Sequence, residues 1–159
     1  MRIIRDYNNE EIVFFVMANM LKNIVVAFDG STNALRAMQK AVQIAGPSDA
    51  MITAVYVIGT PILKKGLYNI TNIQRNVAKQ KAEEILKRAQ GRAKLSKVRF
   101  QSKIISGAPS TAITRFAEDQ KADILIVGAR GLSGAKMAFL GSVSNHIVHA
   151  SKIPILVVK

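Results

Sequence analysis

The hydrophobic positions of the chain follow two alternating patterns from Leu21 onward. Five short runs are apolar and rich in β-branched residues; they lie at 23–28, 50–58, 98–105, 123–127 and 154–158. Runs such as IVVAF and ILIV lack the polar alternation of a half-exposed strand and are typical of parallel strands covered on both faces. The pattern therefore predicts five strands of one parallel sheet.

Between these runs, apolar residues recur at intervals of three and four, which predicts helices. The first helix is expected to follow Ser31 and to stop at Gly46-Pro47. The second is expected over about residues 71–95, with its apolar positions at Ile73, Val77, Ile85, Leu86 and Ala89. The third should follow Pro109 with Ser110 or Thr111 as its cap, and the fourth should begin near Ser142.

Strands that alternate with helices in this way predict an α/β fold, a doubly wound parallel sheet with about four helices on its two faces. The length of 159 residues suits one domain, which we place at 21–159. Residues 1–20 are an N-terminal extension without an assigned role. Their apolar stretch at 12–17 is too short to span a bilayer, which needs about 20 residues, so no membrane span is predicted.

Charge and cysteine content narrow the function classes. The net charge is +13, and residues 64–103 contain twelve Lys and Arg residues against only Glu83 and Glu84. A solvated basic helix face explains this excess, and a binding surface for nucleic acid or an anionic surface is the alternative. No nucleic-acid-binding motif accompanies the charge. The absence of cysteine excludes disulfides, thiolate zinc sites and cysteine nucleophiles, and it agrees with a cytoplasmic location.

Two strand ends carry distinctive chemistry. The first strand ends at Asp29-Gly30-Ser31, and the fourth opens a glycine-rich loop over 128–142. Glycines allow the main chain to approach a ligand closely, and a helix that begins near Ser142 presents unpaired N–H groups to an anion such as phosphate. An aspartate suits a sugar hydroxyl or a metal ion carried by phosphates. Together these features predict a nucleotide site.

Simpler interpretations exist for each feature alone. Asp29-Gly30 is a common turn dipeptide, and Ser142 suits a helix N-cap. The loop is neither a P-loop nor a dinucleotide-binding G-x-G-x-x-G motif. His146 and His149 have no third metal ligand in view, and no Ser/His/Asp set is suggested by spacing.

The spacing Gly128-x2-Gly131-x9-Gly141-Ser142 resembles the G-2x-G-9x-G-(S/T) signature of the ATP-binding branch of the universal stress protein family. The resemblance extends over residues 21–159 and includes NIVVAFDGS, KADILIVGARGLSG and IPILVVK. It implies the strand order 3-2-1-4-5 and a homodimer formed through the last strand, 154–158. It also implies a site for ATP, ADP or AMP. The chemistry of the Asp29 carboxylate adds the option of Mg²⁺ or Mn²⁺ held indirectly through Asp29 and the phosphates. The implied site residues are Ala27, Asp29, Val57, Val127, Gly128, Gly131, Gly141, Ser142, Val143 and Ser144. Arg130 lies inside the same loop and is a further candidate, with a side chain that either reaches a phosphate or points to solvent.

Three functions stay open at this point. The first is an adenine-nucleotide-binding regulatory or stress-response module with slow or no hydrolysis, since the loop offers phosphate ligands but no clear general base. The second is a weak metal-dependent ATPase. The third is an interaction protein that binds nucleic acid or an anionic surface through the basic region 64–103.

Overall fold

A computed structural model of the protein describes residues 21–59, 72–132 and 140–159. The predicted extension 1–20 lies outside the described residues, as do residues 64–71 of the basic region and 133–139 of the glycine-rich loop. Within the described ranges, no helix has both the length and the apolar content needed to cross a bilayer.

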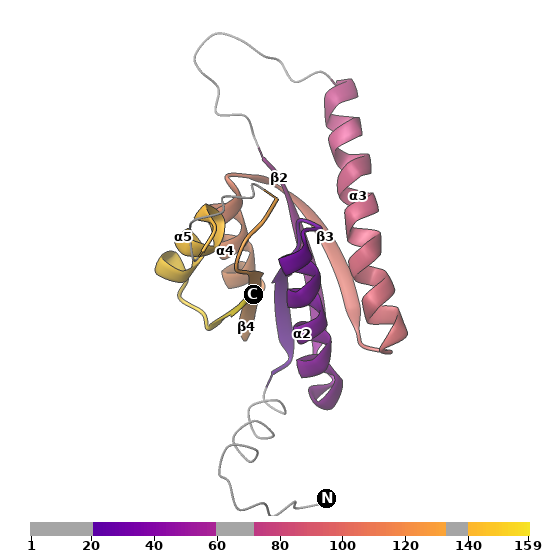
Figure 1. Cartoon of the computed structure of the whole chain (residues 1–159), viewed down its shortest axis with the longest axis vertical. Coiled ribbons are helices and arrows are strands. Elements are labelled where there is room, and N and C mark those ends of the chain that lie inside the picture. The colour runs from indigo at the N-terminus through magenta and orange to yellow at the C-terminus, as the bar shows by residue number, and fades with distance from the viewer. Residues whose placement is uncertain (1–20, 60–71, 133–139) are drawn as a thin grey trace, which may run out of the picture.

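Five parallel strands form one sheet in the order β3-β2-β1-β4-β5, as predicted (Figure 1). Their bounds are Asn23–Ala27 for β1, Met51–Gly59 for β2, Phe100–Gly107 for β3, Ile124–Gly128 for β4 and Ile155–Val158 for β5. The inner strands β1 and β4 bury three consecutive residues each, which is why their sequence lacks polar alternation. Strand β3 begins and ends two residues later than the sequence predicted, since residues 98 and 99 precede the ladder.

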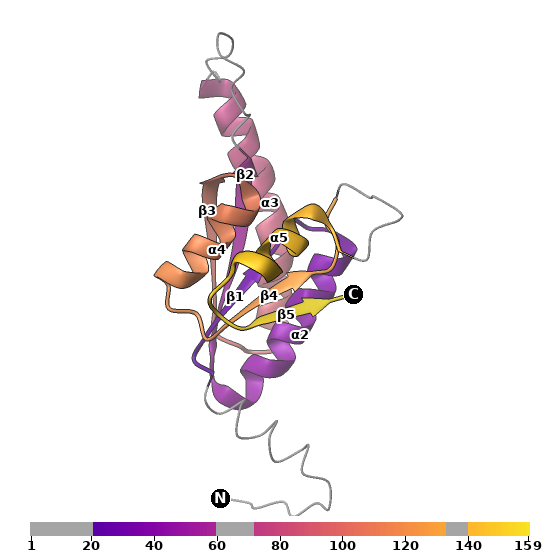
Figure 2. The ribbon, with the colours of Figure 1, turned by 90° about the vertical axis from the view of Figure 1, so that its left-hand side faces the viewer.

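Four helices in the described part of the chain cover the two faces of the sheet. Helices α2 (Thr32–Ser48) and α3 (Asn72–Leu95) lie on one face, and α4 (Pro109–Asp119) and α5 (Ser142–Ala150) lie on the other (Figures 1 and 2). Each face has its own apolar cluster, one around Phe28 and Met38 and one around Leu125 and Ile147. Because β1 lies between β2 and β4, the order of the strands reverses beside β1, and a crevice opens at the carboxyl ends of β1 and β4.

Two helix boundaries differ from the prediction. Helix α2 continues through Pro47 to Ser48 and ends at Asp49, which has a left-handed backbone with φ of 50°. Proline lacks the N–H that would bond within the helix, and the Ser48 hydroxyl adds hydrogen bonds to the carbonyls of Ile44 and Ala45 in the last turn. Helix α4 has Pro109 in its first turn and Ala108 as its N-cap, because the fixed φ of proline suits the first helical position.

The apolar positions predicted for α3 are only partly buried against the sheet. Leu86 and Ala89 are buried and Ile85 is half-buried, but Ile73 and Val77 are 75% and 59% exposed. The first turns of α3 extend beyond the ends of β2 and β3 (Figures 1 and 2). The predicted helix is confirmed, but Ile73 and Val77 are exposed because the helix there has no sheet to pack on.

Candidate functional site

A cavity of about 310 Å³ lies at the carboxyl ends of β1 and β4. All eleven residues proposed from the sequence line it. They come from β1 and the turn after it, from β2, from β4 and its loop, and from the start of α5. The lining also includes residues that sequence reasoning missed: Phe28, Ser31, Ala34, Val55, Tyr56, Pro109, Ile113, Leu132 and Ile147.

Asp29 joins the turn after β1 to the loop after β4. Its Oδ1 accepts a hydrogen bond from the N–H of Ser31 at 2.9 Å, and its Oδ2 accepts one from the N–H of Leu132 at 3.1 Å. The Asp29-Gly30 pair does form a turn, with Gly30 at φ of 82°. The aspartate therefore both shapes the turn and presents a carboxylate at the wall of the cavity.

Ser31 connects the same two segments. Its Oγ accepts from the N–H of Ala34 at 3.2 Å and so caps α2, and it lies 3.4 Å from the carbonyl oxygen of Arg130, to which it donates. The Arg130 side chain is exposed at the rim. The sequence identified Ser31 as the start of a helix but gave no sign of this second contact across the crevice.

The three glycines of the motif have three different surroundings. A Cβ at Gly128 would lie 2.8 Å from the carbonyl carbon of Asn33, so glycine is needed for α2 to pack against β4. A Cβ at Gly131 would lie 2.6 Å from Oδ2 of Asp29, so glycine is needed for the loop to meet the carboxylate. A Cβ at Gly141 would make only ordinary contacts, the nearest at 3.5 Å.

The N-terminus of α5 faces the cavity without a side-chain cap. Gly141 is the N-cap, and Ser142 is the first helical residue, so Ser142 is not the cap that the simpler interpretation suggested. Ser142 and Val143 line the cavity at this helix end. The uncapped N–H groups of the first turn, together with the helix dipole, favour an anion at this position.

Ser144 has a different role from its neighbour. Its side chain is 4% exposed, and its hydroxyl donates to the carbonyl oxygens of Gly128 at 2.8 Å and Ala129 at 3.1 Å. These contacts hold α5 against the end of β4. The Ser144 hydroxyl has one proton, so it could donate to a phosphate only if its hydrogen bonds to both carbonyls were broken. In this structure the hydroxyl therefore positions the loop.

The part of the cavity away from the N-terminus of α5 is apolar. Ala27, Val57 and Val127 line it from the strands, and Pro109 and Ile113 line it from α4. The last two could have been found from the fold, because α4 begins directly after β3 at the same edge of the sheet. His146 and His149 are exposed on α5 and are not among the lining residues. The described residues contain no group of three His, Cys, Asp or Glu side chains placed to hold a metal ion.

Comparison with known proteins agrees with this architecture. The model of the universal stress protein family matches residues 20–159. The chain belongs to the universal stress protein family. The universal stress protein MJ0531 of Methanocaldococcus jannaschii is 32% identical to this chain over 142 residues, which cover 89% of this chain and 84% of the relative. The universal stress protein YxiE of Bacillus subtilis is 29% identical over 148 residues, covering 88% of this chain and all of the relative.

Solved structures of universal stress proteins share the fold. A universal stress protein crystallised in complex with cAMP is 32% identical, with a TM-score of 0.62, and the match covers 87% of this chain and 97% of that one. The protein MJ0577, whose structure was used to assign its biochemical function, is 25% identical with a TM-score of 0.74 and covers 88% and 96% of the two chains. The universal stress protein fold thus accounts for the whole described domain.

Proposed function

We propose that this universal stress protein binds an adenine nucleotide, ATP or its products ADP and AMP, and acts as a regulatory or stress-response module. The observation that carries the proposal is the polarity of one cavity. It is apolar between β1, β2 and α4, and at its other end it meets a glycine loop and the uncapped N-terminus of α5. A nucleotide has the matching polarity, with a flat apolar base at one end and phosphates at the other.

The main chain of β2 supports recognition of the base. Val55 accepts a hydrogen bond at 2.9 Å from the N–H of Phe28, and the pairing of β1 with β2 ends at Ala27 opposite Val55. Alternate residues of a strand direct their N–H and C=O groups to the same side. Val57 therefore directs a donor and an acceptor toward the space beyond the end of β1. Adenine offers the complementary pair, an acceptor ring nitrogen next to an amino donor.

The loop and α5 support binding of the phosphates. The first turn of α5 supplies main-chain N–H groups, Ser142 adds a hydroxyl, and Arg130 places a cation at the rim. Gly131 lets this loop lie against Asp29, whose carboxylate is suited to a ribose hydroxyl. The relative that binds cAMP is 32% identical to this chain, and it supports an adenine nucleotide as the ligand.

The lining residues favour binding over catalysis. Among the described residues of the cavity wall, Asp29 is the one carboxylate and no histidine is present. Both oxygens of Asp29 already accept main-chain hydrogen bonds, so no side chain among the described lining residues is placed to activate a water molecule. A Mg²⁺ or Mn²⁺ ion would take at most this carboxylate from the protein and its other ligands from phosphate and water. The proposal therefore includes slow hydrolysis or none, in the cytoplasm, where adenine nucleotides are abundant.

Mass spectrometry of the small molecules that co-purify with the protein tests the proposal. We expect ATP, ADP or AMP to be released on denaturation of the wild-type protein and to be absent after the same treatment of Asp29→Ala. The reason is that Asp29 joins both walls of the cavity. Retention of a different ligand class, or equal retention of adenine nucleotide by Asp29→Ala, would contradict the proposed site.

We further propose that the protein forms a homodimer through β5. This strand lies at the edge of the sheet, and Ile155, Leu156 and Val157 are only half-buried. An edge strand exposes unpaired N–H and C=O groups that a second copy can pair with. Sedimentation equilibrium at micromolar concentration should give a dimer, and Leu156→Lys should give a monomer that still binds nucleotide. A wild-type monomer under these conditions would overturn this part of the proposal.

A further inference from the structure

Helix α3 has two faces of opposite character. Its inner face packs on the sheet through four buried residues: Ala82, Leu86, Ala89 and Ala93. Its outer face is a stripe of exposed residues separated by three or four positions, which places them on one side of a helix. The outer stripe consists of Ile73, Val77, Gln80, Glu84, Arg88, Gly91 and Leu95.

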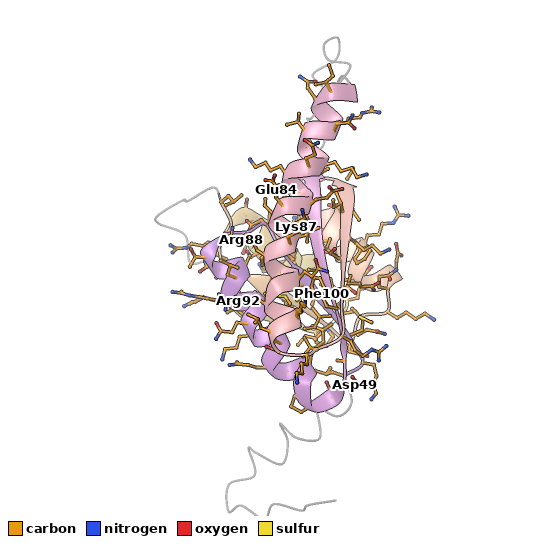
Figure 3. All side chains as sticks on the ribbon, turned by 90° about the vertical axis from the view of Figure 1, so that its right-hand side faces the viewer. Asp49, Glu84, Lys87, Arg88, Arg92 and Phe100 are labelled. Atoms are coloured by element: carbon orange, nitrogen blue, oxygen red, sulfur yellow. The ribbon has the colours of Figure 1, made fainter. Side chains whose placement is uncertain are left out.

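Apolar side chains lie at both ends of the outer stripe. Ile73 and Val77 are 75% and 59% exposed at its beginning, and Leu95 is 85% exposed at its end. Three of the five large exposed apolar residues among the described residues therefore belong to this one helix. The rise of about 1.5 Å per residue separates the two ends by roughly 33 Å. The first turns project beyond the strands, so this end of the stripe has no other element of the sheet beside it (Figures 1 and 3).

Cations flank the stripe on both sides. Helical spacing puts Lys87 and Lys94 on one flank and Lys81 and Arg92 on the other. Figure 3 looks onto this face, where Lys87, Arg88 and Arg92 extend from α3. The helix has seven Lys and Arg residues against two Glu residues, and one of these, Glu83, forms an ion pair with Lys79 at 3.9 Å.

We propose that the outer face of α3 docks on the surface of an anionic lipid bilayer. Exposed apolar side chains flanked by cations are the arrangement by which a peripheral protein contacts lipid, with the apolar groups among the acyl chains and the cations at the headgroup phosphates. A nucleic acid would engage the cations but would leave Ile73, Val77 and Leu95 without a partner. A second copy of the protein would bring two basic helices together, which like charges oppose.

The docking is peripheral and reversible, and it is independent of the nucleotide proposal. Three apolar side chains give little insertion, so electrostatic attraction supplies most of the affinity and salt weakens it. Helix α3 lies on the opposite face of the sheet from α4 and α5, which bound the cavity. One contact does approach the nucleotide site, because Arg88 donates to the carbonyl oxygen of Gly30 at 3.2 Å. Arg88 is therefore left unchanged in the test.

Co-sedimentation of the full chain with vesicles tests the docking. We expect binding to vesicles of phosphatidylcholine with one-third phosphatidylglycerol, and none to phosphatidylcholine alone. The triple variant Lys87→Gln/Arg92→Gln/Lys94→Gln should lower the partition coefficient by about 100-fold, and Ile73→Ser/Val77→Ser by about ten-fold. Glu84→Gln should raise it by about five-fold, since it removes the anion at the centre of the stripe.

A charge-matched control tests whether the membrane-binding site lies on α3. Arg115→Gln/Lys121→Gln/Lys152→Gln removes the same three charges from exposed positions away from α3, and we expect it to bind vesicles nearly as well as wild type. Equal losses in the two triple variants would mean that only net charge matters, and this result would overturn the assignment to α3. Tight binding to a DNA or RNA duplex without binding to anionic vesicles would overturn it in favour of nucleic acid. Circular dichroism of each variant serves as the control that it is folded.

Discussion

Gly131→Val is expected to lower the affinity for ATP by about 100-fold while the protein stays folded. A Cβ at this position would lie 2.6 Å from Oδ2 of Asp29, closer than any normal contact, and valine adds two further methyl groups. Either the carboxylate or the loop must move, and the bond from the N–H of Leu132 to Asp29 is lost with it. Overpacking of this kind costs roughly 1–3 kcal/mol, and its upper end corresponds to the expected loss.

The comparison variants identify the cause of that loss. Gly91→Ala, on the exposed side of α3 where a Cβ meets nothing within 4 Å, should bind ATP as wild type does. If the clash acts through the carboxylate, the double variant Asp29→Ala/Gly131→Val should bind ATP no more weakly than Asp29→Ala alone. The reason is that the effects of substitutions at contacting residues are not additive. Isothermal titration measures all four affinities. Wild-type affinity in Gly131→Val would show that the contact between Gly131 and Asp29 does not shape the nucleotide site.

Gly128→Ala is expected to lower the free energy of unfolding by about 3 kcal/mol. The added Cβ would lie 2.8 Å from the carbonyl carbon of Asn33 and 3.0 Å from the N atom of Ala34, which are main-chain atoms that no rotamer change can move. The first turn of α2 must shift away from the end of β4. Because Asp29 and Ser31 anchor that turn to the loop, nucleotide binding should weaken together with stability.

Urea denaturation checks this second prediction. The midpoint should fall for Gly128→Ala with little change in slope, and it should rise slightly for Gly91→Ala, because alanine is favoured over glycine in a helix by about 1 kcal/mol. A midpoint equal to that of wild type in Gly128→Ala would contradict the close packing of α2 on β4. Together the two sets of measurements would distinguish Gly131, whose substitution weakens nucleotide binding, from Gly128, whose substitution mainly lowers the stability of the fold.

The sequence predicted the sheet well because buried parallel strands have a recognisable composition. The runs around Val25 and Ile126 are apolar, and each belongs to an inner strand that buries three consecutive residues. The strand order came from the resemblance to the universal stress protein family, and the sheet confirms it. Periodicity alone could not have given the order, since it reports which residues are buried and not which strands are neighbours.

The sequence motif predicted which residues belong to the candidate site. It did not predict the contacts that depend on how the chain packs in space. The motif identified Gly128, Gly131 and Gly141 but not their separate reasons, which depend on how close Asn33 and Asp29 come in space. The resemblance implied that Ser144 is a site residue, but it did not reveal that the buried hydroxyl of Ser144 donates to two main-chain carbonyls. The exposure of Ile73 was also hidden, because helical spacing does not reveal where the sheet beneath a helix ends.

Calorimetric titration of the nucleotide-free protein with ATP measures directly whether the cavity binds an adenine nucleotide. We expect saturable binding of one nucleotide per chain, with ATP, ADP and AMP competing for the same site, and an affinity about 100-fold lower in Gly131→Val. Absence of heat and of competition for every adenine nucleotide, with a protein that is folded by circular dichroism, would contradict it.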